Sequence, residues 1–129
     1  MLICWLTVTD LIAIHGEIID VSGGSPGVLD EGALESTVNR PLNLHQYTQE
    51  SDLRVLAASL GYGLVKNHCL VDGNKRIALI AVYTFLAING VELDAPEAEA
   101  ASFFLDLAAT LDPQEQAIEH VAQWLKTYS

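Results

Sequence analysis

The sequence predicts an all-α protein of about six helices, packed around one buried central helix over about residues 74–89. Three observations support this fold class. Apolar residues recur at helical spacing along most of the chain, and helix-starting residues such as Thr7 and Asp30 precede the periodic segments. Asn89-Gly90 is a typical helix stop. The segment that ends there is hydrophobic nearly all round, which is typical of a helix buried inside a bundle.

The expected helices follow one another with short connections. The first is predicted to begin with a capping-box pattern across Thr7 and Asp10, and His15 within it is expected to fill a structural position. The last is opened by Asp112-Pro113. The other helices are expected over about residues 30–39, 52–67, 74–89 and 94–111, after a first helix over 8–20.

The second helix is expected to end at Pro41, because a proline disfavours helical backbone at the residue before it. The residues that follow, as far as Glu50, alternate between apolar and polar side chains. This alternation is clearest over Leu42, Asn43, Leu44 and His45. It suits either a plain loop or a short β-hairpin.

Length and composition set further bounds. A chain of 129 residues, half of them hydrophobic, is expected to fold as a single domain over residues 1–129. A net charge of −11 disfavours direct binding to nucleic acid, and the apolar runs are too short for a membrane span. Cys4 and Cys69 are expected to be free thiols in a reducing cytoplasm.

The most informative stretch runs from His68 to Arg76, directly before the predicted central helix. It holds an imidazole, a carboxylate, a glycine, an amide and two adjacent cations. Backbone N–H groups at a helix start are unpaired, and the helix dipole adds partial positive charge there, so such an end binds phosphate readily. Lys66, Lys75 and Arg76 are half of the six cations in the chain. The stretch therefore predicts a site for phosphoryl or nucleotidyl transfer.

This loop is neither a Walker P-loop nor a dinucleotide fingerprint. A P-loop needs serine or threonine after its lysine, and a fingerprint needs three glycines, whereas this loop has Arg76 after Lys75 and the single Gly73. The stretch instead resembles the Fic/Doc signature, His-x-Phe-x-Asp/Glu-Gly/Ala-Asn-Gly/Lys-Arg. Six positions match this signature: His68, Asp72, Gly73, Asn74, Lys75 and Arg76.

Other positions refine the resemblance. Lys75 places the chain nearer the Doc ("death on curing") branch than the AMP-transferring Fic enzymes. Residues 27–36 also resemble the Doc pattern ahead of its second helix. The chain departs from the signature at Leu70, where the family has an aromatic residue, and at Cys69, where proline is common. The resemblance covers nearly the whole chain and implies the Fido fold.

The resemblance also implies roles for the matching residues. His68 would be the general base that takes a proton from an attacking hydroxyl, and Asp72 would bind Mg²⁺ through the nucleotide phosphates. The phosphates of ATP would be bound by Gly73, Asn74, Lys75 and Arg76. Together with His68 and Asp72, Arg76 would also be a catalytic residue. In the family a flap aligns the target peptide by main-chain pairing, and here that substrate guide would be formed by Leu42, Asn43, Leu44 and His45.

The function that the resemblance implies is that of a Doc-like toxin. Such toxins transfer a phosphate from ATP to a threonine or serine hydroxyl of a target protein, with elongation factor Tu as the expected target, and so inhibit translation. A Phd-like antitoxin is the expected partner, and a cytoplasmic location is expected. Two alternatives stay open on the sequence: a Fic-type AMP-transferase that adenylylates proteins, and an inactive binding module with the same fold.

Overall fold

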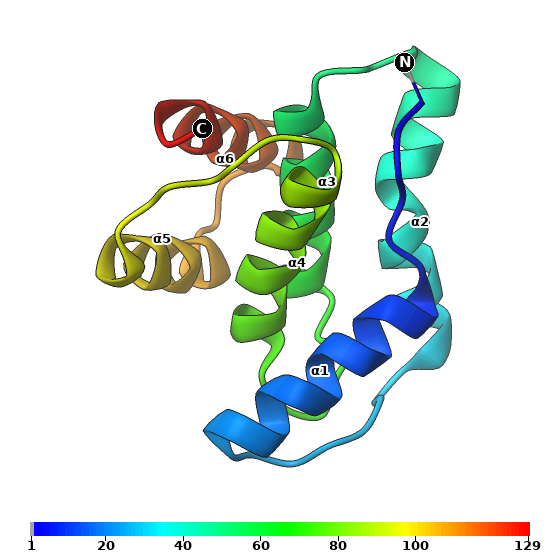
Figure 1. Ribbon diagram of the computed structural model, residues 1–129, viewed down its shortest axis with the longest axis vertical. Coiled ribbons are helices and arrows are strands. Elements are labelled where there is room, and N and C mark those ends of the chain that lie inside the picture. The colour runs from blue at the N-terminus through cyan, green and yellow to red at the C-terminus, as the bar shows by residue number, and fades with distance from the viewer. Residues whose placement is uncertain (1) are drawn as a thin grey trace.

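The computed structural model describes residues 2–129 and consists of six α-helices, with no β-strand in that part of the chain (Figure 1). The predicted fold class is confirmed. The helices are α1 (Val8–Ser22), α2 (Glu31–Thr48), α3 (Leu53–Lys66), α4 (Asn74–Ile88), α5 (Glu97–Ala109) and α6 (Gln114–Thr127). None of them, within residues 2–129, combines the length and apolar composition that a membrane crossing needs.

The middle of the bundle is formed by α3 together with α4 (Figure 1). α3 packs against α2, α4 and α6, and ten of its 14 residues are buried. Small residues let the two central helices approach closely: a Cβ on Gly61 of α3 would lie 2.7 Å from Cγ2 of Val82 in α4. The short loop between α3 and α4 is therefore attached at both ends to the closely packed centre of the bundle.

The helix after the predicted phosphate loop is buried on one face only. Phe85 and Leu86 of α4 are fully buried, in agreement with the predicted central helix. Ile80, Tyr83 and Ile88 are 42–48% exposed, so the expectation of burial on every side is wrong for the outer face. The cause is that α1 and α5 flank α4 without covering this face (Figure 1).

Helix starts follow the capping residues that the sequence indicates. Thr7 and Asp10 form the predicted capping box of α1, with both reciprocal hydrogen bonds present. Asp30 accepts a hydrogen bond from Ala33 N–H at the start of α2, and Asp52 accepts one from Arg54 N–H at the start of α3. These local signals explain why helix positions were predictable.

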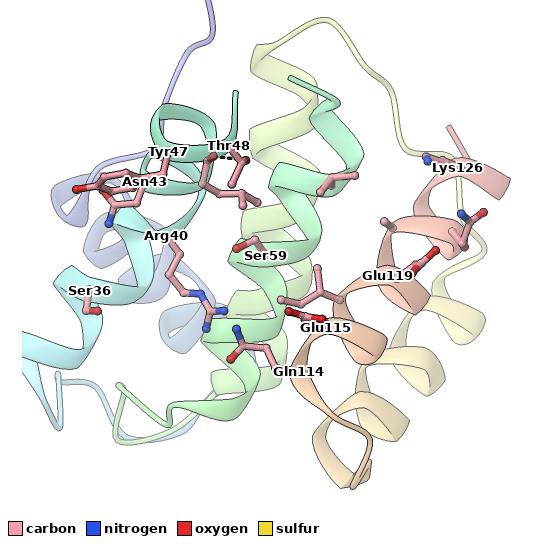
Figure 2. A pocket seen from close by; sticks show the side chains of 15 residues that line it. Ser36, Arg40, Asn43, Tyr47, Thr48, Ser59, Gln114, Glu115, Glu119 and Lys126 are labelled. Carbon is pink, nitrogen blue, oxygen red and sulfur yellow. Dashed lines mark hydrogen bonds between the residues drawn. The ribbon is translucent and has the colours of Figure 1, made fainter. Parts of the chain in front are cut away.

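The second helix does not end at Pro41, and the hairpin prediction is wrong. α2 continues through Pro41 to Thr48, so the predicted substrate guide Leu42, Asn43, Leu44 and His45 is helical. Helical backbone groups are paired within the helix, so this segment offers no free edge for strand addition. Figure 2 shows Asn43 on α2 beside a cavity of about 630 Å³ that lies between α2, α3 and α6.

Candidate active site

The loop from His68 to Gly73 is anchored by two buried side chains. Cys69 and Leu70 are 0% and 2% exposed and belong to the main apolar core, so Leu70 fills the position that the family gives to an aromatic residue. Burial raises the pKa of the Cys69 thiol, which lies 3.7 Å from the buried Thr37 hydroxyl. Both anchors favour one fixed loop conformation, because moving them would expose apolar surface.

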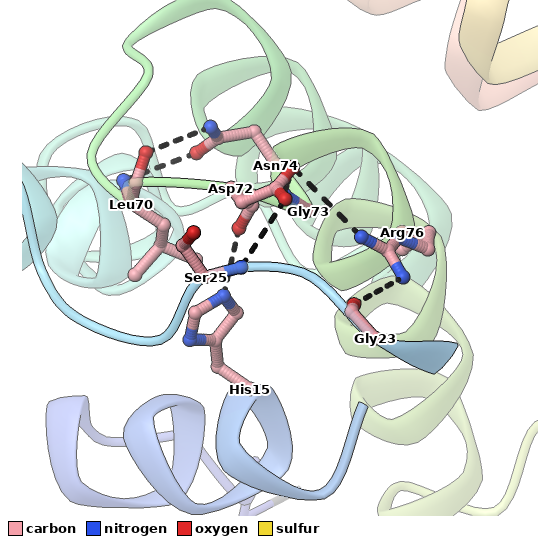
Figure 3. A network of polar contacts seen from close by, with 8 residues as sticks. All are labelled: His15, Gly23, Ser25, Leu70, Asp72, Gly73, Asn74 and Arg76. Atoms are coloured by element: carbon pink, nitrogen blue, oxygen red, sulfur yellow. Dashed lines mark hydrogen bonds and ion pairs between the residues drawn. The ribbon is translucent and has the colours of Figure 1, made fainter. Parts of the chain in front are cut away.

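Asn74 closes the loop with its side chain. Leu70 N–H donates to Asn74 Oδ1 at 3.1 Å, and Asn74 Nδ2 donates back to the Leu70 carbonyl at 3.0 Å (Figure 3). These two hydrogen bonds connect Leu70 of the loop to Asn74, the first residue of α4. The Asn74 amide is thus engaged in loop structure, and contact with phosphate is left to its backbone N–H.

The connection between α1 and α2 runs beside the loop. Val28 and Leu70 form an isolated antiparallel β-bridge, the one such bridge within residues 2–129. Val71 N–H donates to the Gly27 carbonyl at 3.1 Å, and Leu29 N–H donates to the Cys69 carbonyl at 2.8 Å. Backbone pairing near the candidate site therefore comes from residues 27–29 rather than from residues 42–45.

The Asp72 carboxylate is exposed and is held by backbone donors. Gly73 N–H donates to Oδ1 at 2.8 Å and Ser25 N–H donates to Oδ2 at 3.3 Å (Figure 3). These two hydrogen bonds, the first being the stronger influence, lower the pKa of Asp72, and the nearby Arg76 lowers it further. Asp72 is consequently ionised at neutral pH and presents an oriented anion.

This depressed pKa predicts a pH-dependent contribution to stability. The ordinary carboxyl pKa is 3.8, and folding lowers it, so the ionised group stabilises the fold above that pH and the effect is lost as pH falls through the folded pKa. Asp72→Asn is expected to lower Tm slightly at neutral pH, and the difference from the wild type is expected to disappear as the pH falls below 3.8 and through the lowered pKa of the folded state. Thermal unfolding followed by circular dichroism across this range measures it; a gap that stays constant with pH would contradict the assignment.

The start of α4 is open to an anion. Gly73 is the N-cap residue, with φ 76°, and no side chain caps the helix. A left-handed backbone of this kind suits glycine, which lacks a Cβ. The first N–H groups of α4 therefore lack the usual side-chain acceptor, and the helix dipole makes this end attractive to phosphate. Lys75, an exposed cation, stands in the first turn.

Arg76 is oriented by the glycine-rich connection between α1 and α2, residues 23–30. Its Nη1 donates to the Gly23 carbonyl at 3.3 Å, and its Nη2 lies 3.9 Å from Asp72 Oδ1 (Figure 3). Gly24 passes so close that a Cβ there would lie 2.6 Å from Asp72 Oδ2. Because the ion pair is largely exposed, it contributes little to stability, and its effect is to hold the guanidinium beside the carboxylate.

His68 has an unusual backbone conformation. Its φ is 46°, in the left-handed region that non-glycine residues rarely adopt, and the residue is exposed. Strain of this kind is often found at functional sites, where the surrounding structure holds it. The predicted site residues of the motif, from His68 to Arg76, share one cavity of about 320 Å³, lined by His68, Val71, Asp72, Gly73, Asn74, Lys75, Arg76 and Ala108.

Not every residue predicted from sequence takes part. Lys66 donates to the carbonyls of Ala108 and Thr110 at 3.2 and 2.8 Å, so this cation caps the end of α5 and does not line the loop cavity. Residues 42–45 do not line it either. The sequence grouped Lys66 with the loop by proximity along the chain, whereas the side chain extends toward α5.

Sequence reasoning missed two contributors from the N-terminal part of the chain. Ser25 binds the Asp72 carboxylate through its N–H, and His15 of α1 lies 2.8 Å from the Asp72 carbonyl through its Nε2. A signal for His15 was present: it shares a helix face with the buried Leu11 and Ile19. A polar side chain on a buried face needs a hydrogen-bond partner, but the sequence did not show which one.

The fold and the loop together define a helical protein with a candidate anion-binding site at the loop that joins its two central helices. Comparison with known proteins agrees. Residues 5–86 match the family described as Fic/DOC. The chain is 43% identical over 90 residues to "Toxin Doc" of Mycolicibacterium smegmatis, covering 69% of this chain and 65% of that protein. It is 32% identical over 118 residues to "Protein kinase doc" of Escherichia phage P1, covering 91% and 89%.

The chain therefore belongs to the Fic/Doc family, and the resemblance that its signature indicated is confirmed. Both of these relatives carry the name Doc, in agreement with the branch that Lys75 indicated.

Proposed function

We propose that this protein is a Doc-type kinase toxin that transfers a phosphate from ATP to a threonine or serine hydroxyl of a target protein. Elongation factor Tu is the target we propose, with inhibition of translation as the outcome. One relative is named a protein kinase and the other a toxin, which supports this class of activity. The observation that carries the proposal is the open start of α4, with His68, Asp72, Lys75 and Arg76 around one cavity.

The cavity suits the phosphates of a nucleotide. Its volume of about 320 Å³ is at the lower end of the range for ligand pockets, and its lining includes two cations and an uncapped helix start. Lys75 would act as a point charge and Arg76 as a planar fork on phosphate oxygens. Phosphoryl transfer depends mainly on positioning and charge stabilisation, which this set of groups supplies.

The same loop fits a Mg²⁺ ion brought in with the nucleotide. Mg²⁺ prefers oxygen ligands and is commonly bound by one or two carboxylates together with substrate phosphates. Asp72 is exposed, ionised at neutral pH and held in place by Gly73 and Ser25 N–H groups. When bound, the ion would neutralise phosphate charge, and Asp72 would be its protein ligand.

His68 is the proposed general base. The neutral imidazole has a ring nitrogen that can accept the proton of a hydroxyl nucleophile. Its position in the lining of the cavity and its exposure to solvent support this role, because a target hydroxyl could approach it from outside. The neighbouring Cys69 is buried and its thiol pKa is raised, so it does not compete as a nucleophile.

Label transfer from ATP tests the proposal. Purified protein is incubated with Mg²⁺, elongation factor Tu, and ATP labelled on either the γ- or the α-phosphate. We expect transfer of the γ label to the target. Transfer of the α label would instead assign the protein to the AMP-transferring branch. No transfer of either label, to this target or to a bacterial lysate, would favour a binding module.

A Phd-like antitoxin is the partner we propose to restrain the toxin. The outer face of α4 offers a surface for it: Ile80 and Tyr83 are exposed, and they line a cavity of about 320 Å³ shared with the start of α5. Exposed apolar surface of this kind is typical of a protein-binding site. Expression of the chain alone, with full transfer activity and unimpaired growth, would count against a restraining partner.

A further inference from the structure

His15 links α1 to the motif loop through one buried hydrogen bond. The side chain is 4% exposed, and its Nε2 lies 2.8 Å from the backbone oxygen of Asp72. A carbonyl oxygen only accepts hydrogen bonds, so Nε2 carries the proton and donates it. Figure 3 shows the imidazole extending from α1 toward the loop, directly below Asp72 and Ser25.

This hydrogen bond fixes the orientation of a peptide group. In a planar trans peptide, the Asp72 carbonyl and the Gly73 N–H point in opposite directions. Holding the carbonyl toward α1 therefore directs the Gly73 N–H away from α1, and that N–H donates to Asp72 Oδ1 at 2.8 Å. Glycine is flexible, so the peptide group would otherwise have several accessible orientations.

We propose that His15 is a positioning residue for the phosphate site, holding the Asp72 carboxylate in its binding orientation through the Asp72–Gly73 peptide group. The inference deepens the proposed function and rests on it for the part that concerns ATP and Mg²⁺. Groups that orient a ligand of a metal site commonly change affinity or activity by 10–100-fold when removed. The hydrogen bond of His15 goes to the Asp72 carbonyl and not to His68, so the proton-transfer step is expected to stay intact.

Four variants separate positioning from simple packing. His15→Leu keeps an apolar side chain but removes the donor. His15→Gln places an amide N–H where the imidazole Nε2 stood, whereas His15→Asn carries the same amide on a shorter side chain that does not reach the Asp72 carbonyl. Leu11→Ala is the matched packing control, because Leu11 is buried on the same face of α1, one turn earlier.

The first measurement uses the nucleotide-free protein. In ¹H–¹⁵N spectra, the wild type is expected to show a protected imidazole Nε2–H for His15 and a single amide resonance for Gly73. The Gly73 resonance is expected to shift or broaden in His15→Leu and His15→Asn, and to stay near its wild-type position in His15→Gln and Leu11→Ala. This readout requires neither ATP nor activity.

The second measurement is the steady-state kinetics of phosphate transfer. His15→Leu and His15→Asn are expected to raise KM for ATP about tenfold, with a smaller change in kcat, and His15→Gln is expected to recover most of the loss. Leu11→Ala is expected to lower Tm while KM stays near the wild-type value.

Two results would overturn the inference. One is a Gly73 resonance that is unchanged in His15→Leu. The other is an equal rise of KM in all four variants, which would indicate a structural role alone. If the wild type transfers no phosphate from ATP, the proposed function fails, while the Gly73 resonance still decides whether His15 orients the loop.

Discussion

Replacing His68 by alanine is expected to lower the rate of phosphate transfer by about 10²–10⁴-fold, the usual contribution of a general base. The expected cause is loss of the group that we propose accepts the hydroxyl proton, since His68 lines the cavity at the loop and the start of α4. ATP binding is expected to change little, since the groups proposed to bind the phosphates belong to residues 73–76 and the proposed Mg²⁺ ligand is Asp72. Transfer of the γ label at saturating ATP measures the first effect, and equilibrium binding of ATP measures the second.

His68→Gly also removes the imidazole, but glycine adopts the left-handed backbone of this position without strain. It therefore serves as a control for the effect of the backbone conformation on stability. The left-handed φ of 46° costs an alanine about 1 kcal/mol and costs a glycine almost nothing. Both variants are expected to be inactive, with the glycine variant unfolding at the higher temperature. Wild-type transfer rates in His68→Ala would refute the role of general base, and equal Tm values in the two variants would contradict the strained backbone.

Replacing Phe85 by alanine is expected to destabilise the protein by about 3–5 kcal/mol, through lost burial and the cavity that remains. Phe85 is fully buried in α4 and stacks on Trp5 of the N-terminal segment, with ring centroids 5.9 Å apart. Domains of this size are stable by about 5–15 kcal/mol, so the loss is a large part of the total. Urea unfolding at 25 °C measures it directly.

Tyr83→Ala is the matched control, two residues earlier in the same helix. Tyr83 is 48% exposed, and its truncation is expected to cost about 1 kcal/mol or less. The contrast tests the arrangement in which one face of α4 forms the core and the other is free for a partner. Similar losses in the two variants would show that the outer face is also packed.

The helices were predictable because their signals are local. Capping residues such as Asp30 and Asp52 act on N–H groups within three residues, and the periodic apolar residues mark a buried face directly. The end of α2 was not predictable in this way. Local preference favoured a stop at Pro41, but the helix continues because Leu44 packs against the core and His45 lies 5.5 Å from the ring of Trp5. Tertiary contacts outweighed the propensity of one residue.

The same distinction applies to the site. Residues 68–76 are contiguous, so the sequence could group them and predict an anion-binding loop. The contacts that orient this loop come from far along the chain: Ser25 is 47 residues and His15 is 57 residues from Asp72. A pattern in one sequence gives no pairing over such separations. These pairings therefore became visible only when the fold placed α1 and the residues that follow it beside the loop.

The positions of the two cysteines have a practical consequence for biophysical work. Cys4 is exposed in the N-terminal segment, while Cys69 is buried and its thiol pKa is raised. Alkylating reagents act on accessible thiolates, so a maleimide dye is expected to modify Cys4 in the folded protein and to leave Cys69 unmodified. The N–H of Cys4 also donates to the Asn89 side chain at 2.8 Å, which places the label beside the end of α4. The unaltered chain is thus expected to accept a single fluorophore away from the loop of residues 68–73, which would allow binding of the proposed partner to be followed without a further substitution.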